Sequence, residues 1–197
     1  MLYLAIKLAF SLAVRLGFFK LTVIGKENIP VSGGAILAAN HYGPFDPPFI
    51  CLLSRRIVKF MFRRKGRVYS FWRKMMGAFP VNKGKPDRKS LGTAERHLER
   101  GELVGMMVIG HRQKYESNPL PQRGACYLAF KCKVRTAVVP IGIFWSSKKK
   151  PISVYIGCGS PLYRGSYHDS YEMNEALGAS IAQQREIAEQ LARNGVL

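Results

Sequence analysis

Apolar residues run along the chain at two different spacings, which predict alternating strands and helices. Short, largely apolar runs are typical of buried strands, and they occur at Ala35–Ala39, 57–62, 102–109, 136–143 and 152–157, while alternation predicts a further strand at 20–24. Apolar residues near helical spacing over Ser170–Arg193 predict an amphipathic closing helix. This alternation favours an α/β fold, and we expect a single domain with a mixed, largely parallel sheet flanked by helices.

The first 19 residues are apolar except for one narrow polar stripe. Lys7, Ser11 and Arg15 are spaced four apart, so a helix aligns them on one face. A transmembrane helix needs about 20 apolar residues with few charges, and the two cations interrupt that run. The charge and cleavage pattern of a secretory signal is missing from this segment.

We therefore expect residues 1–19 to form a membrane-associating helix that lies in the interface, with Lys7 and Arg15 reaching lipid phosphates. The alternative is a core helix packed on the domain. Residues 20–197 form the α/β domain in either case.

A histidine and an aspartate follow the run Ala35–Ala39, in the order Asn40-His41-x4-Asp46. Ligands of α/β sheets bind beyond the carboxyl ends of strands, which is where His41 is expected. Asp46-Pro47 is a typical helix start, with Asp46 as the N-cap. A carboxylate beside a histidine fixes the ring tautomer and stabilises the imidazolium, which suits a general base. On spacing alone, a helix cap beside an unrelated loop histidine explains the pattern equally well.

Further segments, in order along the chain, decide between these interpretations. A Gly-x-Glu-Asn-Ile-Pro entry at 25–30 precedes the histidine motif, and more likeness follows at 77–90, 101–112 and 123–143. Together these segments resemble the glycerolipid acyltransferases, most closely the bacterial 1-acylglycerol-3-phosphate (lysophosphatidic acid) acyltransferases. Several motifs in the right order are far more specific than one, and the resemblance spans roughly residues 20 to 160.

The resemblance implies a membrane-associated O-acyltransferase of phospholipid biosynthesis. It would move a fatty acyl group from acyl-CoA or acyl carrier protein to the hydroxyl of a lysophospholipid, with 1-acylglycerol-3-phosphate as the first expectation. Direct transfer needs no cofactor and no metal. The matching residues are His41 and Asp46 for catalysis, Lys83 and Arg112 for the acceptor's phosphate, and Asn40, Gly110, His111 and Arg123 as candidates for further substrate contacts.

Several positions depart from the family pattern; Val108 and His111 stand for the family's Pro and Thr, and two further departures bear on how the acceptor is held. Lys83 stands where the family usually has Arg, which keeps the charge and loses the bidentate fork. Ile109 stands where the family has a Glu that is thought to orient the polar acceptor. Three interpretations stay open: another acceptor, the same acceptor with His111 or Glu116 compensating, or a catalytically degenerate lipid-binding relative.

Charge changes the picture of partners. The chain has 31 basic and 12 acidic residues, a net charge of +19, and such a surface attracts polyanions. The sequence has no helix-turn-helix, zinc-finger or RNA-binding signature, so we expect no nucleic acid. The expected partners are anionic membrane lipids, the acyl donor and the lysophospholipid. The expected location is the cell membrane, peripheral or monotopic on its cytoplasmic face.

Cysteine usage points away from a zinc site. Each of the four cysteines lies in an apolar segment, and none forms a Cys-x2-Cys pair. We expect buried, reduced thiols.

Overall fold

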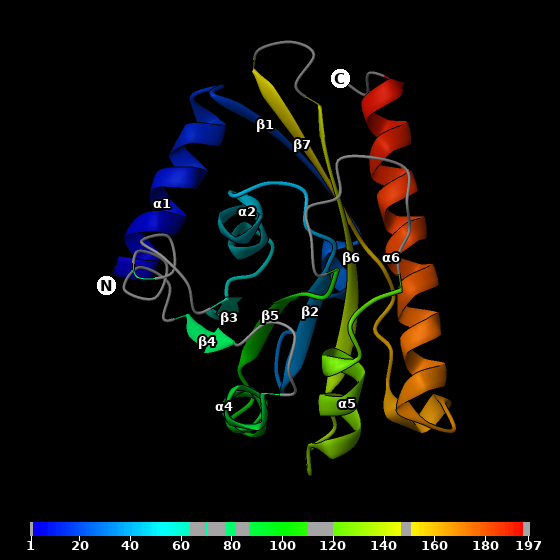
Figure 1. The fold of residues 1–197 in the computed structure, drawn as a ribbon. Helices are drawn as coiled ribbons and strands as arrows, with labels where there is room; N and C mark the ends of the chain where they lie inside the picture. The colour runs from blue at the N-terminus through cyan, green and yellow to red at the C-terminus, as the bar shows by residue number, and fades with distance from the viewer. Residues whose placement is uncertain are drawn as a thin grey trace.

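A seven-stranded mixed sheet forms the centre of the molecule (Figure 1). The computed structural model describes residues 2–63, 70, 78–81, 87–109, 120–146 and 151–194. The strand order is β1-β7-β6-β2-β5-β3-β4, and every neighbouring pair is parallel except the antiparallel pair β6 and β7. The strands are β1 (Phe19–Ile24), β2 (Ala35–Ala39), β3 (Val58–Arg63), β4 (Phe79–Val81), β5 (Leu103–Met107), β6 (Ala137–Ser146) and β7 (Ile152–Cys158). The predicted mixed, largely parallel α/β sheet is confirmed.

Helices cover both faces of this sheet. One face packs against α1 (Leu2–Arg15) and α2 (Asp46–Leu52). The other packs against α4 (Arg88–Glu99), α5 (Gly124–Lys131) and α6 (Ser170–Arg193). Figure 1 shows the two groups on opposite sides of the central strands.

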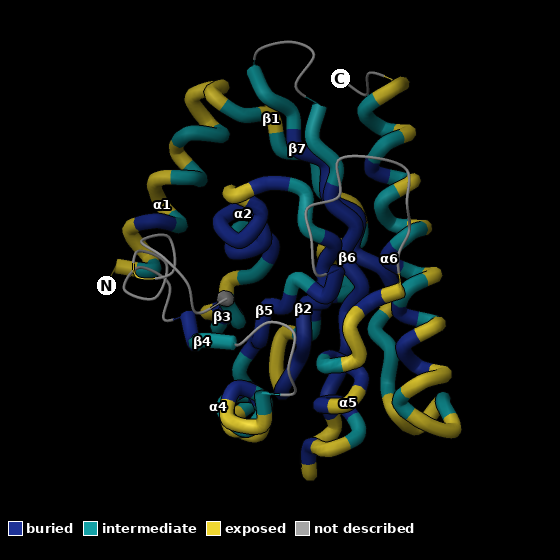
Figure 2. The backbone as a smooth tube through the Cα atoms, in the orientation of Figure 1, coloured by how far each residue is buried: buried dark blue, intermediate teal, exposed yellow. Residues whose placement is uncertain are grey.

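The central strand β2 contributes to both cores. Ala35, Leu37 and Ala39 belong to the core beneath α1 and α2, whereas Ile36 and Ala38 belong to the core beneath α4, α5 and α6. The reason is the alternation of side chains along a strand, which explains why a strand covered on both faces reads as a continuous apolar run. All five residues are buried, and they lie in the dark-blue centre of Figure 2.

The carboxyl ends of three strands meet at one edge, because β2 is parallel to both β5 and β6. The backbone N–H of Val108, just past β5, donates to the Ala39 carbonyl at 3.0 Å. The loop that leaves β2 with His41 therefore starts beside the ends of both neighbours. This edge is where an α/β sheet places its ligands.

The closing helix α6 has the predicted bounds, and it approaches the β6–β7 hairpin very closely. A Cβ built on Gly142 would lie 2.1 Å from the backbone nitrogen of Arg185, and one on Gly157 would lie 2.8 Å from the Gln184 carbonyl oxygen. Only glycine at these positions allows strand and helix backbones to come so near.

The N-terminal helix α1 is packed on one side and open on the other. Its inner side, with Tyr3, Ile6, Phe10 and Val14, joins the core beneath α2. Its outer side carries a row of apolar side chains, with Leu4, Leu8 and Leu12 exposed by 60%, 70% and 51%. In the described part of the chain, no helix combines the length and apolar character required to cross a bilayer.

The structure corrects one expectation for this helix. Lys7 is half-buried, and its ammonium group donates to the carbonyl of Ser54, so Lys7 does not reach outward to lipid phosphates. Burial also lowers the pKa of Lys7 below its usual value. The polar stripe therefore includes a tether to the domain.

Candidate active site

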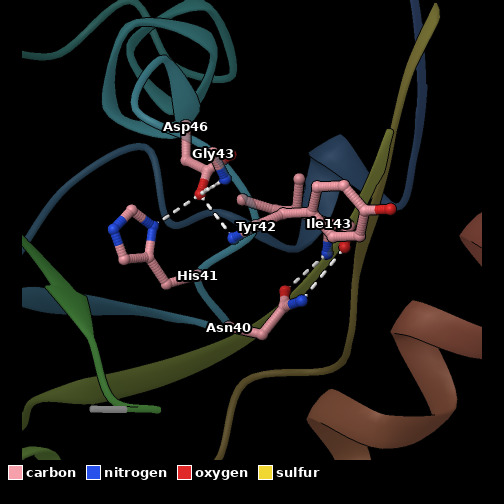
Figure 3. Close-up of polar contacts among 6 residues, drawn as sticks. All are labelled: Asn40, His41, Tyr42, Gly43, Asp46 and Ile143. Carbon is pink, nitrogen blue, oxygen red and sulfur yellow. Dashed lines mark hydrogen bonds and ion pairs between the residues drawn. The ribbon is translucent and has the colours of Figure 1, made fainter. Parts of the chain in front are cut away.

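His41 and Asp46 form a hydrogen-bonded pair in the loop between β2 and α2 (Figure 3). His41 Nδ1 lies 2.7 Å from Asp46 Oδ2, which confirms the predicted proximity of the two side chains. The His41 side chain is 25% exposed, whereas that of Asp46 is completely buried. The pair thus sits at the surface with its carboxylate hidden.

The carboxylate of Asp46 also organises the loop itself. Its Oδ2 accepts hydrogen bonds from the backbone N–H groups of Tyr42 at 2.7 Å and Gly43 at 2.9 Å. With two backbone donors already fixed on this oxygen, His41 Nδ1–H is the third donor. The other ring nitrogen, Nε2, then keeps its lone pair, and Figure 3 shows it turned away from Asp46.

The expectation that Asp46 is the N-cap of the following helix is wrong. Asp46 is the first residue of α2, Phe45 precedes it, and no side chain caps the helix start. The physical reason lies in the next two residues, Pro47 and Pro48, which have no N–H to offer a capping carboxylate. The carboxylate turns back into the loop, where donors exist.

Asn40 has a different role from the one expected. It is fully buried, its Nδ2 donates to the Ile143 carbonyl at 3.0 Å, and its Oδ1 accepts from the Ile143 N–H at 2.7 Å. The side chain thus imitates a strand backbone and ties the start of the loop to β6 (Figure 3). Asn40 therefore braces the histidine loop, and the expected contact with substrate is not supported.

The position of the family's Glu is buried and apolar here. Ile109, directly after β5, is 4% exposed, and Val108 beside it is 2% exposed. Because Val108 bonds to Ala39 at the end of β2, this apolar pair lies at the same edge as the histidine loop. The Ile109 side chain has no polar atom, so it cannot form a hydrogen bond to an acceptor substrate.

The remaining predicted residues are placed only in part. Lys83, Gly110, His111 and Arg112 lie outside the described residues, as does Glu116. Arg123 is exposed just before α5, with its guanidinium carbon 4.2 Å from the ring centre of Tyr171 on α6. The proposed contact of Arg123 with substrate stays a prediction.

Sequence reasoning missed the aromatic side chains that pack around the loop. Phe45 stacks near Trp145 of β6 with ring centres 6.4 Å apart, and Phe10 of α1 lies 5.9 Å from Phe45. Tyr42 also meets Phe144 edge-on at 5.7 Å. The signal in the sequence is a group of aromatic residues within and just after the motif, which does not reveal that β6 and α1 come together there.

Comparisons with known proteins agree on one kind of protein. The model of the Acyltransferase family matches residues 20–144, which include the whole histidine loop. The 1-acyl-sn-glycerol-3-phosphate acyltransferase of Bacillus subtilis (strain 168) is 28% identical over 156 residues, covering 74% of this chain and 75% of that protein. The crystal structure of the 1-acyl-sn-glycerophosphate (LPA) acyltransferase PlsC from Thermotoga maritima shares the fold, with a TM-score of 0.73 at 20% identity, covering 95% of this chain and 78% of that one.

Proposed function

Since the chain belongs to the Acyltransferase family and is an acyltransferase, we propose that it acylates 1-acylglycerol-3-phosphate in phospholipid biosynthesis. The acyl donor is a thioester, either acyl-CoA or acyl-loaded acyl carrier protein. The observation that carries the proposal is the 2.7 Å bond between His41 and Asp46 at the carboxyl edge of the sheet. The named activity of the Bacillus subtilis relative supports the choice of acceptor.

The proposed chemistry is direct transfer with His41 as general base. Nε2 removes the proton of the acceptor hydroxyl as its oxygen attacks the thioester carbonyl. The tetrahedral oxyanion then collapses, the carbon–sulfur bond breaks, and the thiolate takes the proton back from the imidazolium. Asp46 stabilises the imidazolium while it exists. Because the acyl group passes directly from the thioester to the acceptor, the proposed reaction requires no covalent enzyme intermediate and no cofactor or metal.

Cationic side chains complete the proposed substrate site. Lys83 and Arg112 would hold the acceptor's phosphate, with Gly110 and His111 beside it, as the family motifs suggest. The exposed guanidinium of Arg123 is available for the phosphates of the acyl donor. Buried Ile109 favours a second candidate, which is transfer to a lysophospholipid other than 1-acylglycerol-3-phosphate. The third candidate is that the chain binds lipid without transferring an acyl group.

We also propose that the enzyme works on the cytoplasmic face of the cell membrane, as a peripheral or monotopic protein. The exposed leucine row of α1, which comprises Leu4, Leu8 and Leu12, would enter the interface. The net charge of +19 adds attraction to anionic lipids.

Acyl transfer in anionic liposomes tests this function. Purified protein receives labelled acyl-CoA or acyl carrier protein and one of several lysophospholipids, beside a His41→Ala variant. We expect transfer to lysophosphatidic acid that falls by at least about a hundredfold in the variant. Transfer only to another acceptor would replace the proposed substrate. Liposome binding without any transfer would favour the lipid-binding relative.

The chain offers a matched control for this experiment. His97 forms a similar pair, with Nδ1 2.5 Å from Glu102 Oε2, but Glu102 precedes β5 and so lies at the opposite edge of the sheet. His97→Ala should keep nearly full activity. Equal losses in both variants would mean that the loss reflects folding and not a base at His41.

A further inference from the structure

The indole of Trp145 packs against the loop that carries His41 and Asp46. A Cβ built on Gly43 would lie 3.4 Å from Trp145 Cζ2 and 3.5 Å from Cε2 and Cη2, so the six-membered ring of the indole lies close beside Gly43. The same ring stacks near Phe45, 18° from parallel, and meets Phe49 edge-on at 5.6 Å. Trp145 thus contacts residues immediately before Asp46 and one helical turn after it.

Two complementary polar atoms are buried in this region. Within the described residues, Trp145 Nε1 and Asp46 Oδ1 are both buried and have no hydrogen-bond partner. One is a donor only and the other, in a carboxylate, is an acceptor only. Leaving such atoms unpaired costs about 1–3 kcal/mol each, so native proteins pair them or bridge them with ordered water.

We propose that Trp145 is a positioning residue for acyl transfer. Its ring holds the turn from Gly43 to Phe45, and its Nε1–H serves the second carboxylate oxygen of Asp46 through one bound water molecule. The inference rests on the proposed role of His41 as base, because its effect on the reaction passes through the Asp46–His41 bond. With Oδ2 held by three donors and Oδ1 by the indole through that water, the carboxylate has one orientation, and so has the imidazole ring.

A Trp145→Phe variant separates the N–H from the ring, since Phe keeps an aromatic side chain beside Phe45 and Phe49. We expect kcat to fall about tenfold, the size of one hydrogen bond, with KM changed less than about twofold. Without the indole N–H, more of the carboxylate's negative charge acts on His41. The acidic limb of the kcat–pH profile should therefore move to higher pH.

The control is Phe49→Leu, which thins the same aromatic packing and removes no polar group. It should lower the melting temperature and leave the acidic limb in place. Wild-type kcat and an unshifted acidic limb in Trp145→Phe would overturn the proposal, and so would an equal shift in both variants.

A spectroscopic measurement tests the contact without relying on activity. The chain has two tryptophans, so 15N-tryptophan labelling gives two indole N–H signals, and Trp72→Phe assigns them. The Trp145 signal should shift in an Asp46→Asn variant. A Trp145 signal with the same chemical shift in the wild-type protein and in Asp46→Asn would overturn the inference. Inactivity of the wild-type protein alone would count against the proposed function only.

Discussion

At the level of single residues, two aspartates each accept hydrogen bonds from two backbone N–H groups, but only one of them has a further side-chain partner. Asp46 accepts from the N–H groups of Tyr42 and Gly43, and Asp169 accepts from those of Tyr171 and Glu172 at 2.7 and 2.9 Å. Only Asp46 also holds a histidine ring and is fully buried. The two aspartates therefore separate what a carboxylate does for the backbone from what it does for a neighbouring histidine.

An Asp46→Asn variant should lose both stability and activity. The amide offers one acceptor atom and cannot stabilise an imidazolium, so we expect kcat to fall by about 100-fold or more. The free energy of unfolding should fall by about 1–3 kcal/mol, measured by urea denaturation. Asp169→Asn, at the start of α6, should lose stability and keep kcat. Comparable kcat values in the two variants would contradict a catalytic role for Asp46.

Ile109 illustrates how burial limits a residue's chemistry. Its side chain is 4% exposed beside Val108, whereas a residue that orients a polar acceptor needs access to it. Ile109→Glu should therefore lower the free energy of unfolding by about 2–4 kcal/mol, because it places a carboxylate among apolar groups. The control Ile109→Val should cost about 0.5–1.5 kcal/mol. An Ile109→Glu variant with wild-type stability and faster transfer to lysophosphatidic acid would show instead that the position opens onto the acceptor site.

At the level of elements, α1 joins two surfaces with different tasks. Phe10 on its inner side contacts both Phe45 of the histidine loop and Phe49 of α2, at 5.9 and 5.5 Å. The leucine row on its outer side is exposed, and Figure 2 shows exposed yellow stretches along α1. The helix thus lies between the histidine loop on one side and an exposed apolar face on the other.

Charged substitutions in the leucine row should weaken membrane binding without unfolding the protein. For Leu8→Glu with Leu12→Glu, we expect partition to anionic vesicles to fall at least about tenfold, measured by co-sedimentation. The circular dichroism spectrum should be unchanged, since the two side chains are 70% and 51% exposed. Val31→Glu with Leu120→Glu is the charge-matched control on residues that are 92% and 72% exposed. Equal losses in the two double variants would trace binding to net charge and not to the apolar row.

At the level of the whole molecule, each of the two cores contains two free cysteines, which can serve as probes of its solvent access. Cys51 and Cys158 lie in the core beneath α1 and α2, and Cys126 and Cys132 lie in the core beneath α4, α5 and α6. All four are buried, which confirms the expected buried thiols. Burial raises the pKa of Cys51, Cys126 and Cys158 to about 12.

These thiols should be nearly inert in the folded protein. At pH 8 a pKa near 12 leaves about a thousandfold less thiolate than an ordinary cysteine has, so a disulfide reagent should label Cys51, Cys126 and Cys158 only after unfolding. The raised pKa also sets the sign of the pH effect. The folded state keeps the thiol protons longer than the unfolded chain does. The contribution of these thiols to stability is therefore complete below about pH 9 and decreases as the pH rises toward 12. Rapid labelling of one thiol in native buffer would reveal local opening of the core that contains it.

The predictions from sequence succeeded where the chain's own periodicity carries the information. Apolar runs located the strands, helical spacing located α6, and the five-residue separation of His41 and Asp46 was short enough for one loop to join them. The N-cap assignment failed, because local statistics favour Asp before Pro and do not reveal that the Asp46 carboxylate accepts from backbone N–H groups that precede it in the chain, at Tyr42 and Gly43.

The sequence by itself thus determined the strands, the closing helix, the pairing of His41 with Asp46, and the family. Only the tertiary structure decided which distant groups complete the site. Asn40 pairs with Ile143, Trp145 packs on Gly43, and Lys7 turns inward to Ser54, and each pair is far apart in the sequence. Periodicity shows which face of an element is buried, whereas such contacts depend on the order of strands in the sheet and on close packing between elements.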